Sequence, residues 1–247
     1  FIDQTTARSA VDLAVRLKQS QTLYQGETLC LLWNLIDSHD TDRLASMIAN
    51  PDRNYDRENS PRSNSDYDIS RPDRIDRQIQ KQIIAFQMCY IGSPVIYYGD
   101  EAGMWGADDP DDRKPMVWAD KIYESEKSHP LSGKKDKADS IRFDHALFRY
   151  YQSFIKMRND YPVFKEGELL ILESVLKYDC VGFLRTTDNQ QSVVIFNRDE
   201  NEKRVFLKGR ELKFEKYRDL FEGREIIRKN QTEIRIPGKK YAILISE

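Results

Sequence analysis

Apolar and polar residues follow one another in a regular order along the first two thirds of the chain. Apolar side chains recur at helical spacing in residues 3–21, and the continuous apolar run 28–36 that follows is typical of a strand buried on both faces. Helical spacing returns over 75–90, a short apolar run covers 94–98, and another helix is predicted over 147–157. Strands alternating with helices predict parallel pairing with right-handed crossovers.

Two long polar stretches interrupt this order. Residues 49–73 are almost devoid of aliphatic side chains, and residues 106–143 contain the runs DDPDDRKP and KSHPLSGKKDKADS. Each stretch comes after one of the predicted strands. Long loops in compact domains are more often functional than decorative, so both are candidates for a site.

The pattern changes past residue 165. Short alternating or β-branched runs are separated by turn residues, at 168–176, 180–187, 191–197, 203–208, 225–229, 232–237 and 241–246. They predict an antiparallel β domain of about seven or eight strands. We therefore predict an α/β domain over residues 1–162 and an all-β domain over residues 163–247.

The α/β part shows only two strands. A parallel sheet flanked by helices on both faces needs more than two, because each buried strand needs neighbours. We therefore expect the 247 residues to be the C-terminal part of a longer protein, and the missing N-terminal part to be its partner.

Charge and composition exclude some functions. Lys and Arg total 39 and Asp and Glu total 41, so the net charge of −2 gives no electrostatic case for nucleic acid or an anionic membrane as partner. No run approaches the roughly 18 apolar residues of a membrane span. Three widely spaced cysteines indicate core thiols rather than a disulfide or metal site, and they leave the compartment open.

Both predicted strands end in polar residues. The first leads into NLIDSHDTDR (34–43), with the pair His39-Asp40, and the second ends in Gly99-Asp100-Glu101. Catalytic side chains of parallel α/β folds gather at the carboxyl ends of the strands. His39-Asp40 is therefore a candidate site, although the pair could instead satisfy a strand end structurally.

Three motifs in order resemble a known family. NLIDSHDTDR, then GSPVIYYGDEAGM (92–104), then DDPDDRKPMVW (108–118) resemble the α-amylase superfamily, glycoside hydrolase family 13, most closely its neopullulanase, cyclomaltodextrinase and maltogenic amylase group. The resemblance implies the last two strands and helices of a (β/α)8 barrel followed by an antiparallel β-sandwich. It also implies a hydrolase of α-glucosidic bonds in maltodextrin, pullulan or cyclodextrin, with no required cofactor.

The resemblance assigns a role to the His-Asp pair. Retaining glycosidases use one carboxylate as nucleophile and another as acid/base, and contacts to sugar hydroxyls strengthen in the transition state. Asp40 matches the family's third carboxylate, which makes such contacts, and His39 matches a residue that donates to substrate hydroxyls. The Gly-x-Arg-x-Asp type of motif that holds the nucleophile is missing, so we expect this chain to be inactive alone.

Asp109 and Arg113 match family positions that bind a sugar on the non-reducing side of the cleaved bond. A carboxylate that accepts from hydroxyls and a guanidinium that donates suit that task. Asp112 stands where the family has a small or thiol residue, which leaves the local loop geometry open. The acidic run 108–113 could also be a plain surface loop or hold a hard cation, so a calcium ion stays open.

Other functions remain in view. An α-glucosidase or a transglycosylase of the same fold differs only by small pocket changes, and a relative without activity could bind glucan or a partner protein. A metal phosphohydrolase would need more ligands than the two other histidines, His129 and His145, provide. In the closest group a domain outside this sequence creates dimers, so a homodimer is open for a longer protein.

Overall fold

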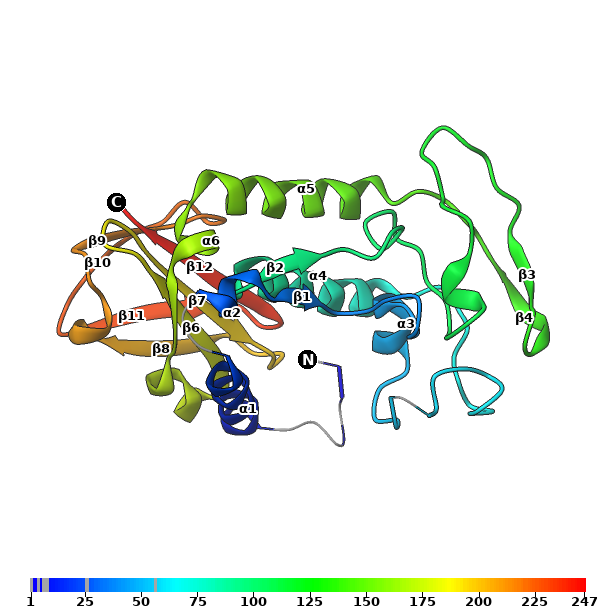
Figure 1. Ribbon diagram of the computed structural model, residues 1–247, viewed down its shortest axis with the longest axis horizontal. Coiled ribbons are helices and arrows are strands. Elements are labelled where there is room, and N and C mark those ends of the chain that lie inside the picture. The colour runs from blue at the N-terminus through cyan, green and yellow to red at the C-terminus, as the bar shows by residue number, and fades with distance from the viewer. Residues whose placement is uncertain (1, 4, 6–8, 25–26, 56) are drawn as a thin grey trace. The chain divides into compact units, whose positions relative to one another are not determined.

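The computed structural model describes residues 2–3, 5, 9–24, 27–55 and 57–247 (Figure 1). The described chain forms two compact units. The first contains Leu35–Gln87 and Pro94–Ile155, and the second contains residues 9–34, Met88–Ser93 and Lys156–Glu247. The predicted boundary between residues 162 and 163 stays a prediction.

The first unit is built around two short strands and two long helices. Its elements are β1 (Trp33–Leu35), α3 (Leu44–Ala49), α4 (Arg74–Cys89), β2 (Ser93–Val95), the 3-10 helix η1 (Asp111–Arg113), β3 (Glu126–His129), β4 (Gly133–Asp139) and α5 (His145–Asp160). Four of these elements, β1, α4, β2 and α5, have some of their residues in the second unit. β1 pairs with β2, and β3 pairs antiparallel with β4. Residues 50–73 hold no helix or strand where the structure describes them, as predicted.

Helices α4 and α5 confirm the predicted periodicity and begin at side-chain caps. The Asp73 carboxylate accepts from the backbone N–H groups of Ile75 and Asp76, and Asp144 caps α5 in the same way. The apolar side of α4 packs against α3 in a cluster that contains Leu44, Ile48, Ile79 and Ile83. This cluster supports the chain on either side of the His-Asp motif.

The prediction of one doubly buried strand over 28–36 is wrong. Residues Thr28–Leu31 form the short helix α2, and β1 begins at Trp33. The side chains of Trp33 and Leu35 are 78% and 49% exposed. Within the described residues β1 pairs only with β2.

The polar stretch 106–143 also contains more structure than its composition predicted. β3 and β4 form a hairpin with an irregular register. Lys135 supports the hairpin because its ammonium group pairs with Glu126 and Asp139 while its side chain is 4% exposed. Charged pairs therefore stabilise a segment that has almost no apolar side chains.

The second unit is dominated by an antiparallel β-sandwich. Its elements are α1 (Ala10–Leu23), α2, α6 (Val163–Glu166), β5 (Glu168–Ile171), the 3-10 helix η2 (Glu173–Tyr178), β6 (Cys180–Thr186), β7 (Gln191–Asn197), β8 (Lys203–Lys208), the 3-10 helix η3 (Gly209–Glu211), β9 (Lys216–Asp219), β10 (Glu225–Ile227), β11 (Gln231–Ile236) and β12 (Lys240–Ser246). One sheet has the order β10-β9-β12-β7-β6-β5, and β8 pairs with β11 in the other.

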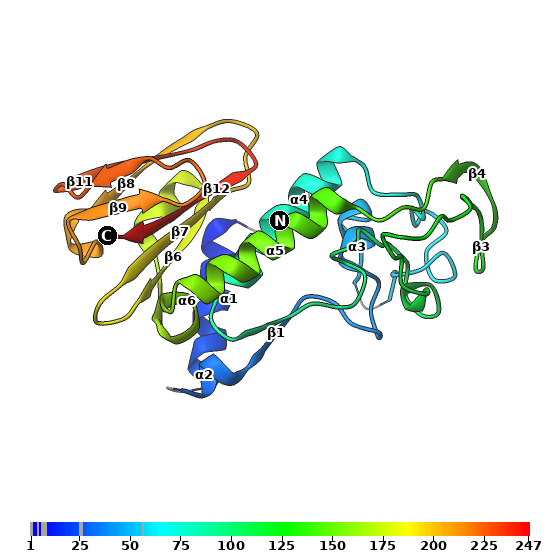
Figure 2. The same ribbon diagram turned by 90° about the horizontal axis from the view of Figure 1, so that it is seen from above.

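The sandwich encloses its own hydrophobic core. Inward side chains from both sheets pack together, among them Leu184, Val193, Val205, Ile234 and Leu244. Figure 2 shows the β8–β11 pair as a layer beside the larger sheet. Alternation of buried and exposed residues along β8 and β11 produces this layering. The predicted β domain is confirmed, although the polar strand β9 (KYRD) was not predicted.

Helix α1 begins later than the apolar spacing predicted. Ser9 and Asp12 form a reciprocal capping box that starts the helix at Ala10. Part of the predicted range, including Ala7, lies outside the described residues. α1 packs near β6 through its buried Ala10 and Ala14.

Candidate active site

The loop after β1 presents His39 and Asp40 to solvent. Hydroxyl groups close this turn: the Ser38 N–H donates to Thr41 Oγ1 (3.1 Å), and the Asp40 N–H donates to Ser38 Oγ (3.2 Å). The side chains of His39 and Asp40 are 65% and 71% exposed, and Nε2 of His39 lies 3.4 Å from Oδ2 of Asp40. Thr41 therefore orients the loop.

Arg113 brings the predicted site residues of two distant loops together. Its Nε and Nη2 atoms donate to the His39 carbonyl oxygen at 3.1 and 2.8 Å. Nη2 lies 3.6 Å from Oδ1 of Asp40, and Nε lies 3.2 Å from Oδ1 of Asp109. All four predicted site residues thus form one half-exposed cluster, which we call the Arg113 cluster: His39, Asp40, Asp109 and Arg113.

The buried side chain of Arg43 holds the loop after β1 in place. Its guanidinium group is fully buried and donates to the Tyr98 carbonyl oxygen (2.7 Å) and to Oδ1 of Asp100 (3.1 Å). It also lies 4.6 and 4.8 Å from the ring centres of Tyr97 and Tyr98. Arg43 consequently has no exposed group with which to bind sugar. The Tyr98 side chain is 40% exposed, although it ends the apolar run 94–98.

A buried carboxyl pair lies beside Arg43. Asp37 and Asp100 are 3% and 2% exposed, and Oδ2 of Asp37 accepts from the Leu44 N–H at 2.7 Å. Burial raises the pKa of both carboxyl groups, and the Asp37 charge raises the pKa of Asp100 further. One cation faces two carboxyl groups, so the ionisation of both groups together is disfavoured. Asp100 is therefore a structural group behind the cluster and does not reach solvent.

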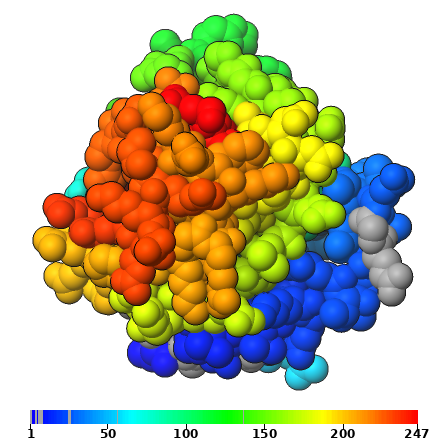
Figure 3. All heavy atoms as spheres, turned by 90° about the vertical axis from the view of Figure 1, so that its left-hand side faces the viewer, coloured from blue at the N-terminus to red at the C-terminus, as the bar shows by residue number. Residues whose placement is uncertain are grey.

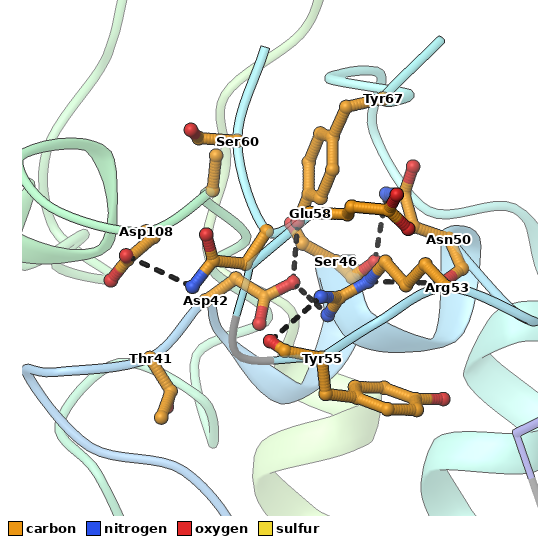
Figure 4. Close-up of polar contacts among 12 residues, drawn as sticks. Thr41, Asp42, Ser46, Asn50, Arg53, Tyr55, Glu58, Ser60, Tyr67 and Asp108 are labelled. Carbon is orange, nitrogen blue, oxygen red and sulfur yellow. Dashed lines mark hydrogen bonds and ion pairs between the residues drawn. The ribbon is translucent and has the colours of Figure 1, made fainter. Parts of the chain in front are cut away.

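A second buried network ties the 50–73 loop to the same motif (Figure 4). The Asp42 carboxylate pairs with the Arg53 guanidinium group and accepts from the Tyr67 hydroxyl at 2.6 Å. Burial raises the pKa of Asp42 to about 6. Sequence reasoning missed all three residues, because they lie 11 and 25 positions apart with no motif spacing.

The acidic run 108–113 spreads its carboxylates among separate partners. Asp108 accepts from the Asn59 side chain (2.9 Å), and Asp111 accepts from the Ala107 N–H (2.9 Å). Nδ1 of His129 accepts from the Leu131 N–H, so the ring proton sits on Nε2, which faces Asp111 at 2.9 Å. His129 thus has a structural partner.

No metal centre is evident in the described part of the chain. There, no group of three or more His, Cys, Asp or Glu side chains is placed to hold a metal ion, and we derive no step through calcium. The described helices include none that is long and apolar enough to cross a membrane.

Two tryptophans lie near the acidic run in the sequence. Trp105 is buried, with 5% of its surface exposed, whereas Trp118 is 57% exposed.

Asp112 is buried at an unfavourable position. Its carboxyl group is fully buried, and neither oxygen has a hydrogen-bond partner among the described residues. Burial, which outweighs the opposing charge of Arg113, raises the pKa of Asp112 to about 6. The backbone around Asp111 and Asp112 is tightly packed, because a Cβ on Gly106 would lie 2.3 Å from the Asp111 carbonyl oxygen. We therefore expect the buried Asp112 carboxyl group to lower the stability of the folded state.

Replacing Asp112 with asparagine should change the pH dependence of stability. A carboxyl group with a folded pKa of about 6, above its usual 3.8, stabilises the folded state below pH 3.8 and loses this contribution as pH rises through 6. Relative to wild type, Asp112→Asn should gain up to about 3 kcal/mol of unfolding free energy between pH 4 and 7. Denaturant unfolding at several pH values measures this.

A matched control is the exposed carboxylate Asp120, whose side chain is 78% exposed. Asp120→Asn should show a pH-independent stability difference near zero. A pH-independent difference for Asp112→Asn would contradict the cost of burial that we assign to this carboxylate.

Comparison with known proteins shows the family of the chain. Residues 4–167 match the model of the α-amylase catalytic domain. The chain belongs to the α-amylase family of glycoside hydrolases, near the group of neopullulanases, cyclomaltodextrinases and maltogenic amylases.

Among curated relatives, neopullulanase 2 of Thermoactinomyces vulgaris is 26% identical over 93% of this chain and 31% of its own length. A cyclomaltodextrinase of a Bacillus species is 27% identical over 69% of this chain and 22% of its own length. The intracellular maltogenic amylase of Bacillus subtilis is 28% identical over 80% of this chain and 26% of its own length. The chain therefore spans a third or less of these relatives.

Solved structures share the fold. A debranching enzyme from Nostoc punctiforme superimposes with a TM-score of 0.67 at 19% identity, over 96% of this chain and 40% of that one. An α-amylase of Anoxybacillus gives 0.66 at 19% identity, over 94% and 42%. At this level of identity the likeness supports the fold alone.

Proposed function

We propose that this chain supplies one part of the active site of a glycoside hydrolase that cleaves α-glucosidic bonds with retention of configuration. The observation that carries the proposal is the Arg113 cluster, in which four residues chosen from the sequence meet although about 70 positions separate the two loops. Exposed carboxylates and donors at one point are what binding of sugar hydroxyls requires.

Asp40 would act on the transition state. An oxocarbenium-like sugar ring strengthens hydrogen bonds from its hydroxyls, and an exposed carboxylate can accept them. His39 would donate its ring N–H to a neighbouring hydroxyl, since its Nε2 lies beside Asp40 at 3.4 Å. Both side chains are more than half exposed, so a sugar can reach them.

Asp109 and Arg113 would hold a sugar unit away from the cleaved bond. The Arg113 Nε atom lies 3.2 Å from Asp109 while the Arg113 side chain stays 47% exposed. Donor and acceptor are thus already positioned relative to each other before substrate binds, which reduces the ordering cost of binding.

The nucleophile and the acid/base would come from polypeptide outside these 247 residues. A retaining mechanism needs both of those carboxylates, and no family motif for the nucleophile is present in the sequence. The small share of each relative that the chain covers supports this. In the proposed whole, β1 and β2 are the last two strands of the barrel, residues 1–162 close it, and residues 163–247 form the sandwich domain. A homodimer of such a longer protein is a further part of the proposal.

The proposed substrate is an α-glucan oligosaccharide such as maltodextrin, pullulan or cyclodextrin. The names neopullulanase and cyclomaltodextrinase of its relatives support this class. An α-glucosidase or transglycosylase would use the same cluster, and a non-catalytic relative would use it only to bind glucan. Product analysis separates these cases, because a transglycosylase forms longer oligosaccharides.

The first test is the mass and N-terminal sequence of the polypeptide as its source makes it, together with its activity on pullulan and cyclodextrin. We expect a polypeptide larger than the 29.1 kDa of this chain, with retained anomeric configuration in the product. A natural product of 29.1 kDa that acts alone would overturn the assignment of the other two carboxylates.

In the polypeptide as its source makes it, Asp109→Ala should raise KM for a maltooligosaccharide about 10- to 100-fold and change kcat only a few-fold. Hydrogen bonds to a charged group contribute about 1.5–3 kcal/mol, and contacts made equally in ground and transition state act on KM. Asp120→Ala is the control, because this exposed carboxylate lies outside the cluster. An unchanged KM would identify the acidic run as a plain surface loop.

A further inference from the structure

Two adjoining hollows lie on the outer side of the β-sandwich. The first has a volume of about 420 Å³ and is lined in part by Ser174, Tyr178, Phe206, Lys208 and Gln231. The second has a volume of about 780 Å³ and is lined by Lys208, Gly209, Arg210, Arg228, Lys229 and Asn230. Lys208 lines both, so the two hollows are neighbours. Figure 3 shows this side of the second unit, where gold and orange residues reach the surface.

The first hollow offers an aromatic surface edged with polar groups. β8 alternates so that Val205 and Leu207 enter the core while Phe206 faces outward, 37% exposed. Helix η2 places the Tyr178 ring 6.5 Å from the Phe206 ring, tilted by 45°. The Ser174 hydroxyl has no hydrogen-bond partner within the described residues. Aromatic rings with nearby hydrogen-bonding groups suit a sugar, which has C–H faces and hydroxyl edges.

Charges at the first hollow are unequal. Its carboxylate, Glu173, is already paired with Lys18. Lys177 places its ammonium group 4.9 Å from the centre of the Tyr178 ring. The aromatic surface therefore carries a cation beside it and no unpaired carboxylate in the described chain.

The second hollow gathers four cations from two chain segments. The Gly209 N–H donates to the Asn230 carbonyl oxygen at 2.9 Å, which joins the end of β8 to the start of β11. A Cβ at Gly209 would lie 2.8 Å from the Lys229 carbonyl oxygen, so glycine permits this close approach. Lys208 and Arg210 are thereby held next to Arg228 and Lys229.

These four cations lack the partners that other cations of the sandwich have. Arg198, Lys203 and Arg218 each pair with a carboxylate within 4 Å. Among the described residues, no carboxylate lies within that distance of the four cations of the second hollow. Arg228 is held by the carbonyl oxygens of Leu212 and Lys213 at 3.2 and 3.4 Å. Unpaired like charges at one point repel one another, which a bound anion would relieve.

We propose that the two hollows form one binding site for an α-glucan that carries phosphate monoesters. A sugar ring packs on Phe206 and Tyr178, and a phosphate on that chain binds Arg210, Lys229 and Lys208, since guanidinium and ammonium groups donate to phosphate oxygens. The glucan part rests on the proposed function, whereas the phosphate part rests on the cations alone. The site lies wholly within the second unit and shares no residue with the Arg113 cluster.

The test measures binding of the 247-residue chain to amylopectin with a high phosphate content, and to the same amylopectin after phosphatase treatment. Inorganic phosphate, neutral maltoheptaose and dextran sulfate complete the probes, all at one ionic strength. We expect the phosphorylated glucan to bind at least about 10-fold more tightly than the dephosphorylated one, and more tightly than dextran sulfate.

Variants separate the two halves of the site. Lys208→Ala combined with Lys229→Ala should abolish the preference for phosphorylated glucan, and Phe206→Ala should weaken binding of both glucans about 10-fold, in line with one lost stacking contact. Arg204→Ala is the matched control, because Arg204 lies on the same exposed face of β8 but lines neither hollow. Circular dichroism checks that each variant is folded.

Equal binding of the two amylopectins would overturn the proposal, as would equal binding of dextran sulfate, which would indicate a non-specific polyanion surface. A loss in Arg204→Ala as large as in the double variant would do the same. Asp120→Asn, which lies outside the Arg113 cluster and lines neither hollow, must bind the phosphorylated glucan as wild type does. If that binding persists while the source polypeptide cleaves no glucan, the proposed function fails and this site stands.

Discussion

Replacing Asp40 with asparagine is expected to lower kcat of the source polypeptide on an α-glucan by at least about 10³-fold, with a smaller change in KM. The substitution keeps the size of the side chain but removes the charge that would strengthen hydrogen bonds to the sugar in the transition state. The turn should survive, because it is closed by the Asp40 backbone N–H and by the hydroxyls of Ser38 and Thr41.

Stability measurements keep this prediction independent of folding. The Asp40 side chain is 71% exposed, and exposed ion pairs contribute at most about 1 kcal/mol. The variant should therefore unfold at nearly the wild-type temperature. Asp120→Asn, an exposed carboxylate outside the cluster, should retain wild-type kcat. A loss of less than tenfold for Asp40→Asn would remove Asp40 from the chemical step.

Replacing Arg185 with leucine is expected to lower the unfolding free energy by about 3–5 kcal/mol. Arg185 lies on β6 with a fully buried guanidinium group, whose pKa burial lowers to about 10. The group donates to the carbonyl oxygens of Gly167, Cys89 and Phe164 at 2.8–3.1 Å. Leucine would leave these buried carbonyl groups without a donor, and each such group costs about 1–3 kcal/mol.

Two variants isolate the cause of that loss. Arg185→Lys keeps a cation but has one compact head group, which cannot donate to three carbonyl groups in a fork, so it should lose nearly as much stability. Arg204→Leu on strand β8 of the other sheet should change stability by less than about 0.5 kcal/mol, because the Arg204 side chain is 60% exposed. Denaturant unfolding followed by circular dichroism measures all three. If Arg185→Leu and Arg204→Leu lowered the unfolding free energy equally, the stabilising role that we assign to the hydrogen bonds of Arg185 would be contradicted.

Local patterns predicted the regular elements well where one periodicity acts alone. The recurrence of Ile79 and Ile83 identified α4, and Asp73 marked its start. The alternating runs of the last third identified the strands of the sandwich, including β7 and β12. Strand β9 was not predicted, because only Tyr217 and Asp219 are buried and the segment KYRD contains no apolar run.

The run 28–36 shows where such patterns fail. Its apolar residues fit a buried strand and an apolar helix equally well, because a short run has no measurable period. The chain divides it into α2 and β1 and leaves Trp33 exposed. Burial of a strand depends on the neighbours it pairs with, and the composition of the strand does not supply them.

The sequence by itself predicted the antiparallel β domain and the helices α4 and α5, because periodicity is a local property. Its resemblance to a family, carried by three motifs in order, named His39, Asp40, Asp109 and Arg113 as candidates. Only the tertiary structure decided that Arg113 joins the two loops, that Arg43 and the Asp37–Asp100 pair are buried beneath them, and that the Asp112 carboxyl group is buried with no hydrogen-bond partner among the described residues. Those facts depend on which distant groups meet in a low-dielectric interior, where hydrogen bonds and charges act through space rather than along the chain.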